Sequence, residues 1–260
     1  QPLDDLRRVM DGVAVQPQDR ERLALAAGVP NYAQQPEPNQ DDGEYARLVK
    51  EWTTKPEFIS PLVDHLPVRT GIPRPKDVLG YHIGAPKKLT NVADQQRYFR
   101  ELEKATPRVK TMVAGTSEEG RDIMIVFVSS ETNIRNLDAN RQNMKRLADP
   151  RSLSDVEARQ LVASTKPHYH VSAGLHSIEY SPPETVMELA YRLAVSDEAY
   201  IRQIRDNVIV SISPATDVDG RDRAVDGRRR LVLRQRRQRG VQQRAQGRVR
   251  PPAHLRPPRH

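Results

Sequence analysis

Residues 173–184 read AGLHSIEYSPPE, and this stretch joins a predicted strand to a predicted helix. The strand covers residues 169–174 (YHVSAG), and the helix covers residues 182–195 (PPETVMELAYRLAV), with proline in its first turn, where a helix tolerates it. In open α/β sheets, ligands bind beyond the carboxyl ends of the strands. The polar side chains of the joining segment are therefore the first candidates for a functional site.

His176 and Glu179 stand three residues apart in this segment. On one turn of chain, side chains at that spacing can point the same way and share one metal ion. Zinc accepts imidazole nitrogen and carboxylate oxygen, and catalytic zinc sites use three protein ligands and a water. The same spacing also arises by chance, as a capping histidine beside a glutamate that starts a helix. The pair alone therefore leaves a metal site and a structural role open.

Regular elements surround this segment from about residue 77 to residue 226. Strands alternate with helices, and two strands are apolar on both faces, which is typical of an α/β sheet covered by helices on both sides. Strands are predicted for residues 108–114, 122–129, 169–174 and 207–213, and helices for residues 39–52, 91–105, 133–147, 154–165, 182–195 and 197–206. Residues 116–121 (TSEEGR) are predicted to turn a β-hairpin between the first two strands, with Gly120 at a positive φ.

The net charge of +8 comes from one end of the chain. Residues 228–260 contain 12 of the 42 basic residues and no acidic residue, so residues 1–227 hold 30 basic against 34 acidic residues, a net charge of −4. The last part of the chain is rich in arginine, glutamine, proline and glycine, contains no Phe, Trp or Tyr, and shows no helical or strand period. We expect residues 227–260 to form a disordered tail. We expect no nucleic-acid binding by the rest of the chain, so any such binding would occur through this tail.

Composition excludes two classes of protein. The chain of 260 residues has no cysteine, which excludes a disulfide scaffold and a thiolate metal site. It has no run of 18 apolar residues, which excludes a membrane-spanning helix. The first residue is Gln1 rather than methionine, so we interpret the chain as a fragment or a processed product.

Three segments, in order, resemble the zinc carboxypeptidase family, the carboxypeptidase A-like exopeptidases. Residues 115–123 (GTSEEGRDI) resemble the G-x-S-x-E-G-R hairpin of the family. Residues 176–182 (HSIEYSP) resemble its H-x-x-E pair followed by Ser-Pro. Residues 207–221 run from an apolar strand into DVDGR, which is similar to the family's strand ending in N-P-D-G, with Asp217 and Val218 in place of the Asn and Pro.

The resemblance covers about residues 77–226 and implies a mixed, mostly parallel α/β sheet with helices on both faces, incomplete at the C-terminus. It implies that His176 and Glu179 are two of three zinc ligands, that a downstream histidine is the third, and that the protein hydrolyses C-terminal residues from peptides. Zinc would polarise the scissile carbonyl and lower the pKa of its water. A later glutamate would act as general base, and arginine and asparagine side chains would hold the terminal carboxylate of the substrate.

Several of the family's later parts have no counterpart in this sequence. The histidines downstream of the pair are His254 and His260, which stand in the Arg/Pro-rich tail with no predicted strand beneath them, and we assign neither as a ligand. No glutamate follows Glu198, so no general base is assigned, and Arg221 and Arg223 match no substrate-binding arginine. We therefore expect weak zinc binding and little or no peptidase activity from this chain.

The sequence predicts three parts. Residues 1–76 form a partly helical N-terminal extension, residues 77–226 form a partial zinc carboxypeptidase-like catalytic domain, and residues 227–260 form the tail. Because the composition changes at once after residue 226, we hypothesise that the tail is the product of a shifted reading frame or an equivalent truncation. A genuine basic tail that binds RNA or an anionic surface is the rival hypothesis. The absence of interleaved aromatic residues counts against it.

Two alternatives to a catalytic site at the pair stay open. A non-catalytic relative that kept the fold after losing a ligand would bind peptides or carbohydrates. His168 and His170 would face the same side of a strand and form a rival metal site, although they stand at the start of the strand. His65 and His82 lie outside any pattern and are predicted to be surface residues.

The expected cofactor is therefore Zn²⁺, and the expected partner is the C-terminus of a peptide or protein substrate. The common habit of the family predicts a secreted or periplasmic location, although the sequence shows no signal peptide. No oligomeric state is predicted.

Overall fold

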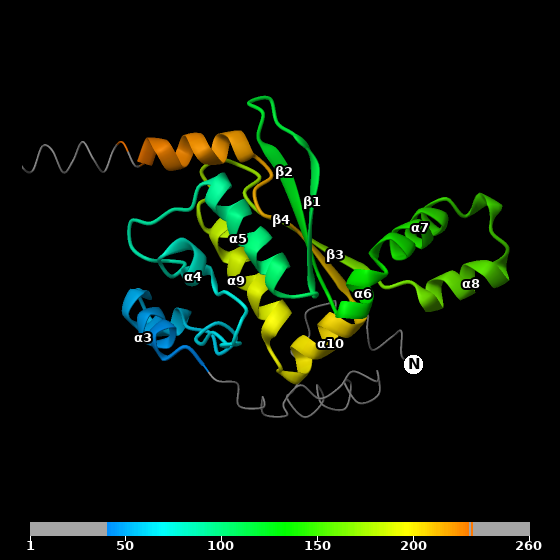
Figure 1. Cartoon of the computed structure of the whole chain (residues 1–260), viewed down its shortest axis with the longest axis horizontal. Helices are drawn as coiled ribbons and strands as arrows, with labels where there is room; N and C mark the ends of the chain where they lie inside the picture. The colour runs from blue at the N-terminus through cyan, green and yellow to red at the C-terminus, as the bar shows by residue number, and fades with distance from the viewer. Residues whose placement is uncertain (1–40, 229, 231–260) are drawn as a thin grey trace, which may run out of the picture.

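The computed structural model describes residues 41–228 and residue 230, which form a four-stranded sheet with helices around it (Figure 1). The helices are α3 (Gly43–Trp52), α4 (Pro75–Leu79), α5 (Val92–Ala105), α6 (Glu131–Arg135), α7 (Leu137–Ala148), α8 (Asp155–Ser164), α9 (Ser181–Val195) and α10 (Ala199–Asn207), with short 3₁₀ turns η1 (Pro56–Phe58) and η2 (Pro150–Ser152). The strands are β1 (Val109–Thr116), β2 (Asp122–Val128), β3 (His168–Ser172) and β4 (Ile209–Ser213), and a last helical run covers residues 218–228. The predicted strands and helices are confirmed close to their expected bounds, except that the helix predicted for residues 133–147 is two helices that meet at Asn136.

The sheet has the strand order β1-β2-β4-β3. β1 and β2 form the predicted hairpin, with Gly120 at φ +79° in its turn. β2 pairs with β4 in antiparallel orientation, and β4 pairs with β3 in parallel orientation. The mixed α/β class is confirmed, but one of the three pairings among the described strands is parallel, so this part of the sheet is not mostly parallel. The short hairpin allows only antiparallel pairing, whereas α9 and α10 supply the long crossover that the parallel pair of β3 and β4 requires.

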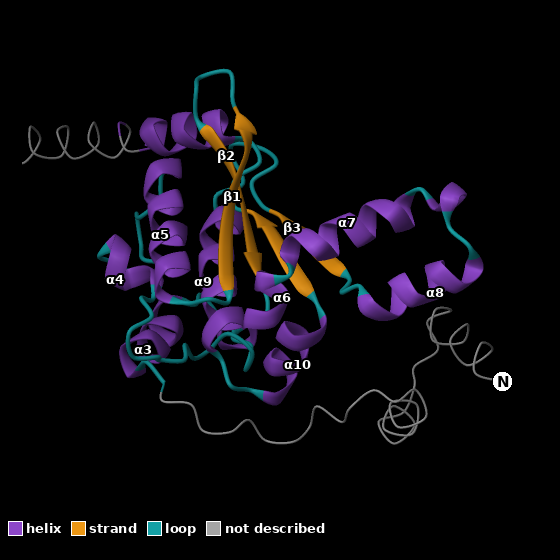
Figure 2. Ribbon diagram, turned by 45° about the vertical axis from the view of Figure 1, so that its right-hand side comes forward, coloured by secondary structure: helices purple, strands orange, loops and turns teal. Residues whose placement is uncertain are grey.

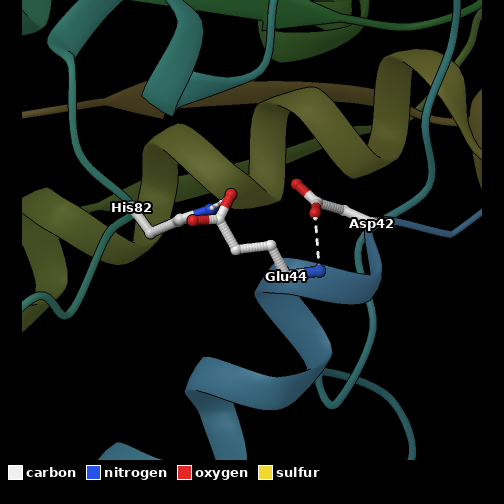
Figure 3. A group of neighbouring side chains, drawn as sticks. All are labelled: Asp42, Glu44 and His82. Carbon is white, nitrogen blue, oxygen red and sulfur yellow. Dashed lines mark hydrogen bonds and ion pairs between the residues drawn. The ribbon is translucent and has the colours of Figure 1, made fainter.

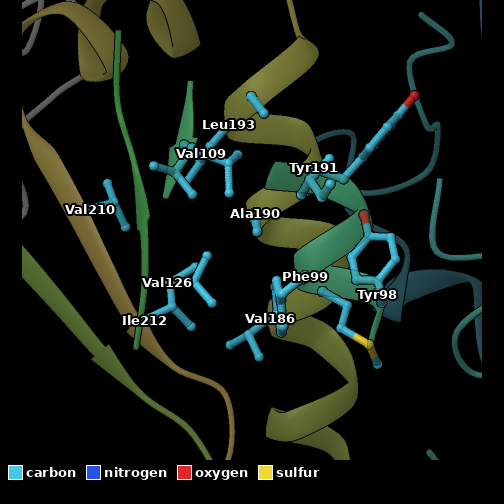
Figure 4. Close-up of a cluster of buried hydrophobic side chains, with 14 of the residues drawn as sticks. Tyr98, Phe99, Val109, Val126, Val186, Ala190, Tyr191, Leu193, Val210 and Ile212 are labelled. Carbon is cyan, nitrogen blue, oxygen red and sulfur yellow. The ribbon is translucent and has the colours of Figure 1, made fainter. Parts of the chain in front are cut away.

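One face of the sheet packs against α5 and α9, and this contact forms the core (Figure 4). α9 turns Val186, Ala190 and Leu193 toward the strands, a spacing of four and three residues that places them on one side of a helix. They meet the buried Val126 and Ile212 of β2 and β4. Because this face is closed, the positions of β3 and β4, and of the loops that follow them, are set by apolar packing.

α7 and α8 form a helical hairpin that extends away from the sheet (Figure 2). Asn140 of α7 anchors the base of this hairpin to the chain just before β3. Its side-chain nitrogen donates to the carbonyl of Lys166 at 3.0 Å, and its oxygen accepts from the Lys166 amide at 2.7 Å. The start of β3 is therefore tied to the helical hairpin.

The segment before α5 packs on the same core. Tyr45 of α3 and Leu66 belong to the main buried cluster, and the Tyr45 hydroxyl donates to Glu188 Oε2 on α9 at 2.8 Å. His82 is 7% exposed and its ring lies 5.7 Å from the ring of Tyr45, so the prediction that His82 is a surface residue is wrong. His65 is half-buried between Asp64 and Glu198, because the N-terminal segment closes over the corner between α9 and α10. The predicted helix within residues 39–52 is confirmed as α3.

The chain ends bear on two further predictions. Residues 227, 228 and 230 are helical, while the remainder of the predicted tail and residues 1–40 of the predicted extension lie outside the described residues. Among the described helices, none is long and apolar enough to cross a membrane.

Candidate metal centre

His176 and Glu179 lie in the loop that connects the end of β3 to the start of α9. Gly174 turns the chain out of the sheet at φ +60°, a conformation that favours glycine. A Cβ at this position would lie 2.8 Å from Cγ of Pro183, so the loop also needs glycine for close approach to the helix start. The pair therefore stands at the carboxyl edge of β3, where ligands of open α/β sheets collect.

The side chains of His176 and Glu179 converge. His176 Nδ1 lies 2.9 Å from Glu179 Oε1, and the His176 amide donates to Glu179 Oε2 at 3.1 Å. The loop closes one turn between them, because the Glu179 amide donates to the His176 carbonyl at 3.1 Å. The hydrogen bond with the His176 side chain lowers the pKa of Glu179 below its usual value, so this group is a carboxylate at neutral pH.

These two donor atoms fit zinc. Two ligands on a tetrahedral zinc ion, each 2.0–2.1 Å from it, stand roughly 3.3 Å apart. The observed 2.9 Å between Nδ1 and Oε1 needs to open by only a few tenths of an ångström. The side chains are 70% and 38% exposed, which leaves room for further ligands. Within residues 41–228, no third histidine, aspartate or glutamate donor lies close enough to complete the set.

A buried ion pair lies beneath this loop. Arg221, in the helical run 218–228, is 2% exposed and donates to the carboxylate of Glu184 in the first turn of α9. Its guanidinium also donates to the carbonyl of Tyr180 at 3.2 Å, directly after Glu179. The sequence offered no role for Arg221, and its burial shows a role inside the protein rather than in contact with a substrate.

The hairpin turn and the start of the helical run 218–228 contact one another. Ser117 Oγ donates to Asp219 Oδ1 at 2.8 Å, and Arg121 donates to the same oxygen at 2.7 Å. Arg121 Nε also donates to Asp222 Oδ2 at 2.9 Å. Asp217 accepts from the Gly220 amide at 2.8 Å, as an N-cap residue does. Two of the three segments on which the family resemblance rests therefore form one structural unit.

A cleft of about 600 Å³ opens beside the pair, between the loop after β3 and the helical run 218–228. It is lined by Ser177, Ile178, Tyr180, Asp217, Gly220, Arg223, Ala224, Gly227 and Arg228. The guanidinium of Arg228 lies 5.7 Å from the ring centroid of Tyr180. The cleft thus combines an apolar and aromatic wall with positive charge.

The rival pair His168 and His170 is held by protein groups. His168 Nε2 lies 3.0 Å from the side-chain nitrogen of Asn140, and burial lowers the pKa of His168. His170 Nδ1 lies 2.9 Å from the hydroxyl of Ser211, and its Nε2 lies 3.3 Å from that of Ser213. These contacts occupy three of the four ring nitrogens, which favours a structural role for the pair.

A third group of possible metal ligands, which the sequence did not predict, consists of Asp42, Glu44 and His82 (Figure 3). One ligand atom of each residue lies within 4.8 Å of the others. The Lys76 ammonium already lies 2.6 Å from Glu44 Oε2 and 3.6 Å from Asp42 Oδ2, so a cation of the protein itself balances these carboxylates. Nothing in the spacing of these residues indicates a site, because His82 stands 38 positions after Glu44 and joins it only through the fold.

Comparisons with known proteins give the following relatives. Residues 96–247 match the family model described as zinc carboxypeptidase. No curated protein sequence matches the chain significantly. Among solved structures, bovine thrombin-activatable fibrinolysis inhibitor in complex with tick carboxypeptidase inhibitor is 14% identical, with a TM-score of 0.34, over 52% of this chain and 33% of that one. A structure of thrombin-activatable fibrinolysis inhibitor is 13% identical, with a TM-score of 0.37, over 57% of this chain and 31% of that one. The chain spans about a third of the length of these structures. Since the family model covers more than half of this chain, the chain belongs to the zinc carboxypeptidase family.

Proposed function

We propose that His176 and Glu179 are the first two zinc ligands of a metallocarboxypeptidase that hydrolyses C-terminal residues from peptides. The observation that carries this proposal is the 2.9 Å separation of His176 Nδ1 and Glu179 Oε1 at the carboxyl edge of β3. Membership of the zinc carboxypeptidase family supports it, because the pair stands in the segment that resembles the family's H-x-x-E motif.

The residues of the pair are prepared for this role. Glu179 must be a carboxylate to bind a metal, and its lowered pKa keeps it one. His176 would bind through Nδ1, which leaves Nε2 to carry the ring proton. A bound zinc ion supplies Lewis-acid polarisation of the scissile carbonyl and lowers the pKa of its water. The adjacent cleft offers space for the C-terminal part of a peptide next to the metal.

The described residues supply two donors, where a catalytic zinc site uses three protein ligands. We therefore propose weak zinc binding and little or no hydrolysis for this chain. Stoichiometric tight zinc together with turnover of a blocked dipeptide would contradict this part of the proposal. Tight zinc binding without hydrolysis would instead favour a non-catalytic relative that binds peptides or carbohydrates.

Zinc titration against a chromophoric chelator tests the assignment of the ligands. The wild-type chain should bind one zinc ion, and His176→Ala and Glu179→Gln should each lose it. His170→Ala is the matched control, because His170 is also exposed but is hydrogen-bonded to serine hydroxyls. If His176→Ala retains the affinity of the wild type, or if His170→Ala loses it, the ligand assignment is wrong.

A further inference from the structure

Arg221 and Glu184 form an ion pair that is almost completely excluded from solvent. The side chain of Arg221 is 2% exposed and that of Glu184 is 9% exposed. A charge taken out of water is costly unless a partner and further hydrogen bonds compensate it. Such compensation is present here, because Thr90 donates to both oxygens of Glu184, from its amide at 2.6 Å and from its hydroxyl at 2.6 Å.

The guanidinium of Arg221 distributes its donors over three segments. Nη2 donates to Glu184 in α9. Nε and Nη2 donate to the carbonyl of Thr90, before α5, at 3.2 and 3.0 Å. Nη1 donates to the carbonyl of Tyr180 at 3.2 Å. The planar fork of one arginine thus ties the residue next to Glu179 to two helices of the core.

The backbone beside Arg221 also presses on the loop. A Cβ at Gly220 would lie 2.8 Å from Cβ of Ser177, the residue after His176, and 2.0 Å from Oδ2 of Asp217. Glycine is therefore the residue that lets the helical run approach the loop this closely. The loop with the pair is held from beneath by the side chain of Arg221 and from the side by the backbone at Gly220.

We propose that Arg221, with Glu184 as its counter-ion, is a positioning residue that orients the Glu179 carboxylate toward His176. This inference rests on the proposed function, because the orientation of Glu179 affects zinc binding only if Glu179 and His176 are zinc ligands. Arg221 holds the carbonyl of Tyr180, one residue after Glu179, at 3.2 Å. It thereby fixes the loop backbone close to the residue from which the Glu179 side chain projects. Lysine cannot substitute for it, because one ammonium group cannot reach acceptors in three segments with a planar fork.

Arg221→Lys is the test variant, and Arg205→Lys is its matched control. Arg205 is 5% exposed, and its guanidinium also donates to backbone carbonyls, those of Leu193 and Ser196, at 3.0 and 2.9 Å. These acceptors lie at the far end of α9, about 20 Å along the helix from the loop. Both variants keep a buried positive charge but lose the several N–H donors of the guanidinium, so both should be less stable toward urea. Only Arg221 lies beside the candidate metal loop.

Two readouts separate positioning from stability. Zinc affinity, measured where each protein is folded, should fall by about 10- to 100-fold in Arg221→Lys, the range for loss of an outer-shell partner, and should stay within about threefold of wild type in Arg205→Lys. Amide hydrogen exchange over residues 175–181 should accelerate in Arg221→Lys alone. Thr90→Val removes the hydroxyl that donates to Glu184 and that also contacts Tyr81, but it keeps the amide that donates to Glu184. It should shift both readouts in the same direction by less, and it replaces Arg221→Lys as the test if that variant does not fold.

The outcomes distinguish this inference from the proposed function. Equal zinc affinity, or equal exchange over residues 175–181, in Arg221→Lys and Arg205→Lys would overturn the positioning role. If the wild-type chain binds no zinc, the proposed function fails, and hydrogen exchange alone decides whether Arg221 orders the loop. Loss of zinc affinity in both lysine variants would show a general effect of stability and would also overturn the positioning role.

Discussion

Nη1 of Arg121 lies 2.7 Å from Oδ1 of Asp219, and this ion pair joins segments that are 98 residues apart in the chain. Arg121 ends the turn of the β1–β2 hairpin, and Asp219 stands in the first turn of the helical run 218–228. The hydrogen bond with Asp219 is the main cause of a raised pKa of Arg121. The hairpin turn thus holds the helix that presses on the candidate metal loop.

Asp219→Asn should destabilise the fold by about 1–3 kcal/mol, because it weakens charge-assisted bonds from Arg121 and Ser117 to a mostly buried carboxylate. Urea unfolding measures the change. The control is Asp149→Asn, because the Asp149 carboxylate pairs with Arg151 in an exposed, local contact and its loss should leave the stability nearly unchanged. Equal effects of the two substitutions would show that the long-range pair adds nothing to stability.

Gly174→Ala should be more damaging than Gly120→Ala. Both glycines have positive φ, so alanine costs about 1–3 kcal/mol of backbone strain at either position. At Gly174 the added Cβ also collides with Pro183, whereas at Gly120 no atom lies within 4 Å. We expect the larger loss of unfolding free energy, and the loss of zinc affinity, in Gly174→Ala alone. Zinc titration and urea unfolding of both variants check this, and unchanged zinc affinity in Gly174→Ala would contradict it.

Tyr45→Phe should weaken the attachment of α3 to α9. The substitution removes the hydroxyl that donates to Glu188 Oε2 and leaves this half-buried carboxylate without that donor, at a cost of about 1–3 kcal/mol. Burial raises the pKa of Glu188, and the hydrogen bond from Tyr45 opposes this rise, so the variant should raise the pKa of Glu188 further. Urea unfolding gives the free energy, and Tyr81→Phe, at a hydroxyl that contacts Thr90 instead, controls for loss of a tyrosine hydroxyl at another site. A Tyr45→Phe protein as stable as the wild type would show that the contact does not hold α3.

Stability should fall as the pH rises through the pKa of His65. Burial alone would lower this pKa, but hydrogen bonds with Asp64 at 2.8 Å and Glu198 at 2.9 Å outweigh burial and raise it above the usual value. The protonated form is therefore favoured in the folded state. Its contribution is fully present below the unfolded pKa, about 6.5, and is lost as pH rises through the higher folded pKa.

The free energy of unfolding, measured in urea from pH 5.5 to 8.5, checks the role of His65. The wild type should lose stability over the upper part of this range, and His65→Gln should lose that part of the slope. Substitution of another half-buried histidine, His168→Gln, should leave the slope in place, because burial lowers the pKa of His168 rather than raising it. A slope that persists unchanged in His65→Gln would assign the pH dependence to other groups.

The sequence by itself determined the secondary structure and the position of the candidate pair. Strands and helices follow from local apolar periodicity and from turn and cap residues, so β1 to β4, α5 and α8 to α10 are predicted close to their true bounds, whereas α6 and α7 are predicted as one helix. His176 and Glu179 were found for a similar reason, since three residues separate them and one turn of chain is enough to bring their donor atoms together. The surface prediction for His82 failed because its burial depends on a helix that lies 30 or more residues away.

Only the tertiary structure decided what surrounds the pair. Glu184 and Arg221 are 37 residues apart, and Thr90 is 94 residues from Glu184, so no spacing in the sequence indicates that these groups meet under the loop. The direction of β4 between β2 and β3 likewise depends on the packing of α9 and α10 against the sheet. Such contacts form because apolar faces close on one another and force the remaining polar groups to find partners inside the protein. A short segment can therefore reveal which residues could bind zinc, while the packed fold determines which groups hold them in place.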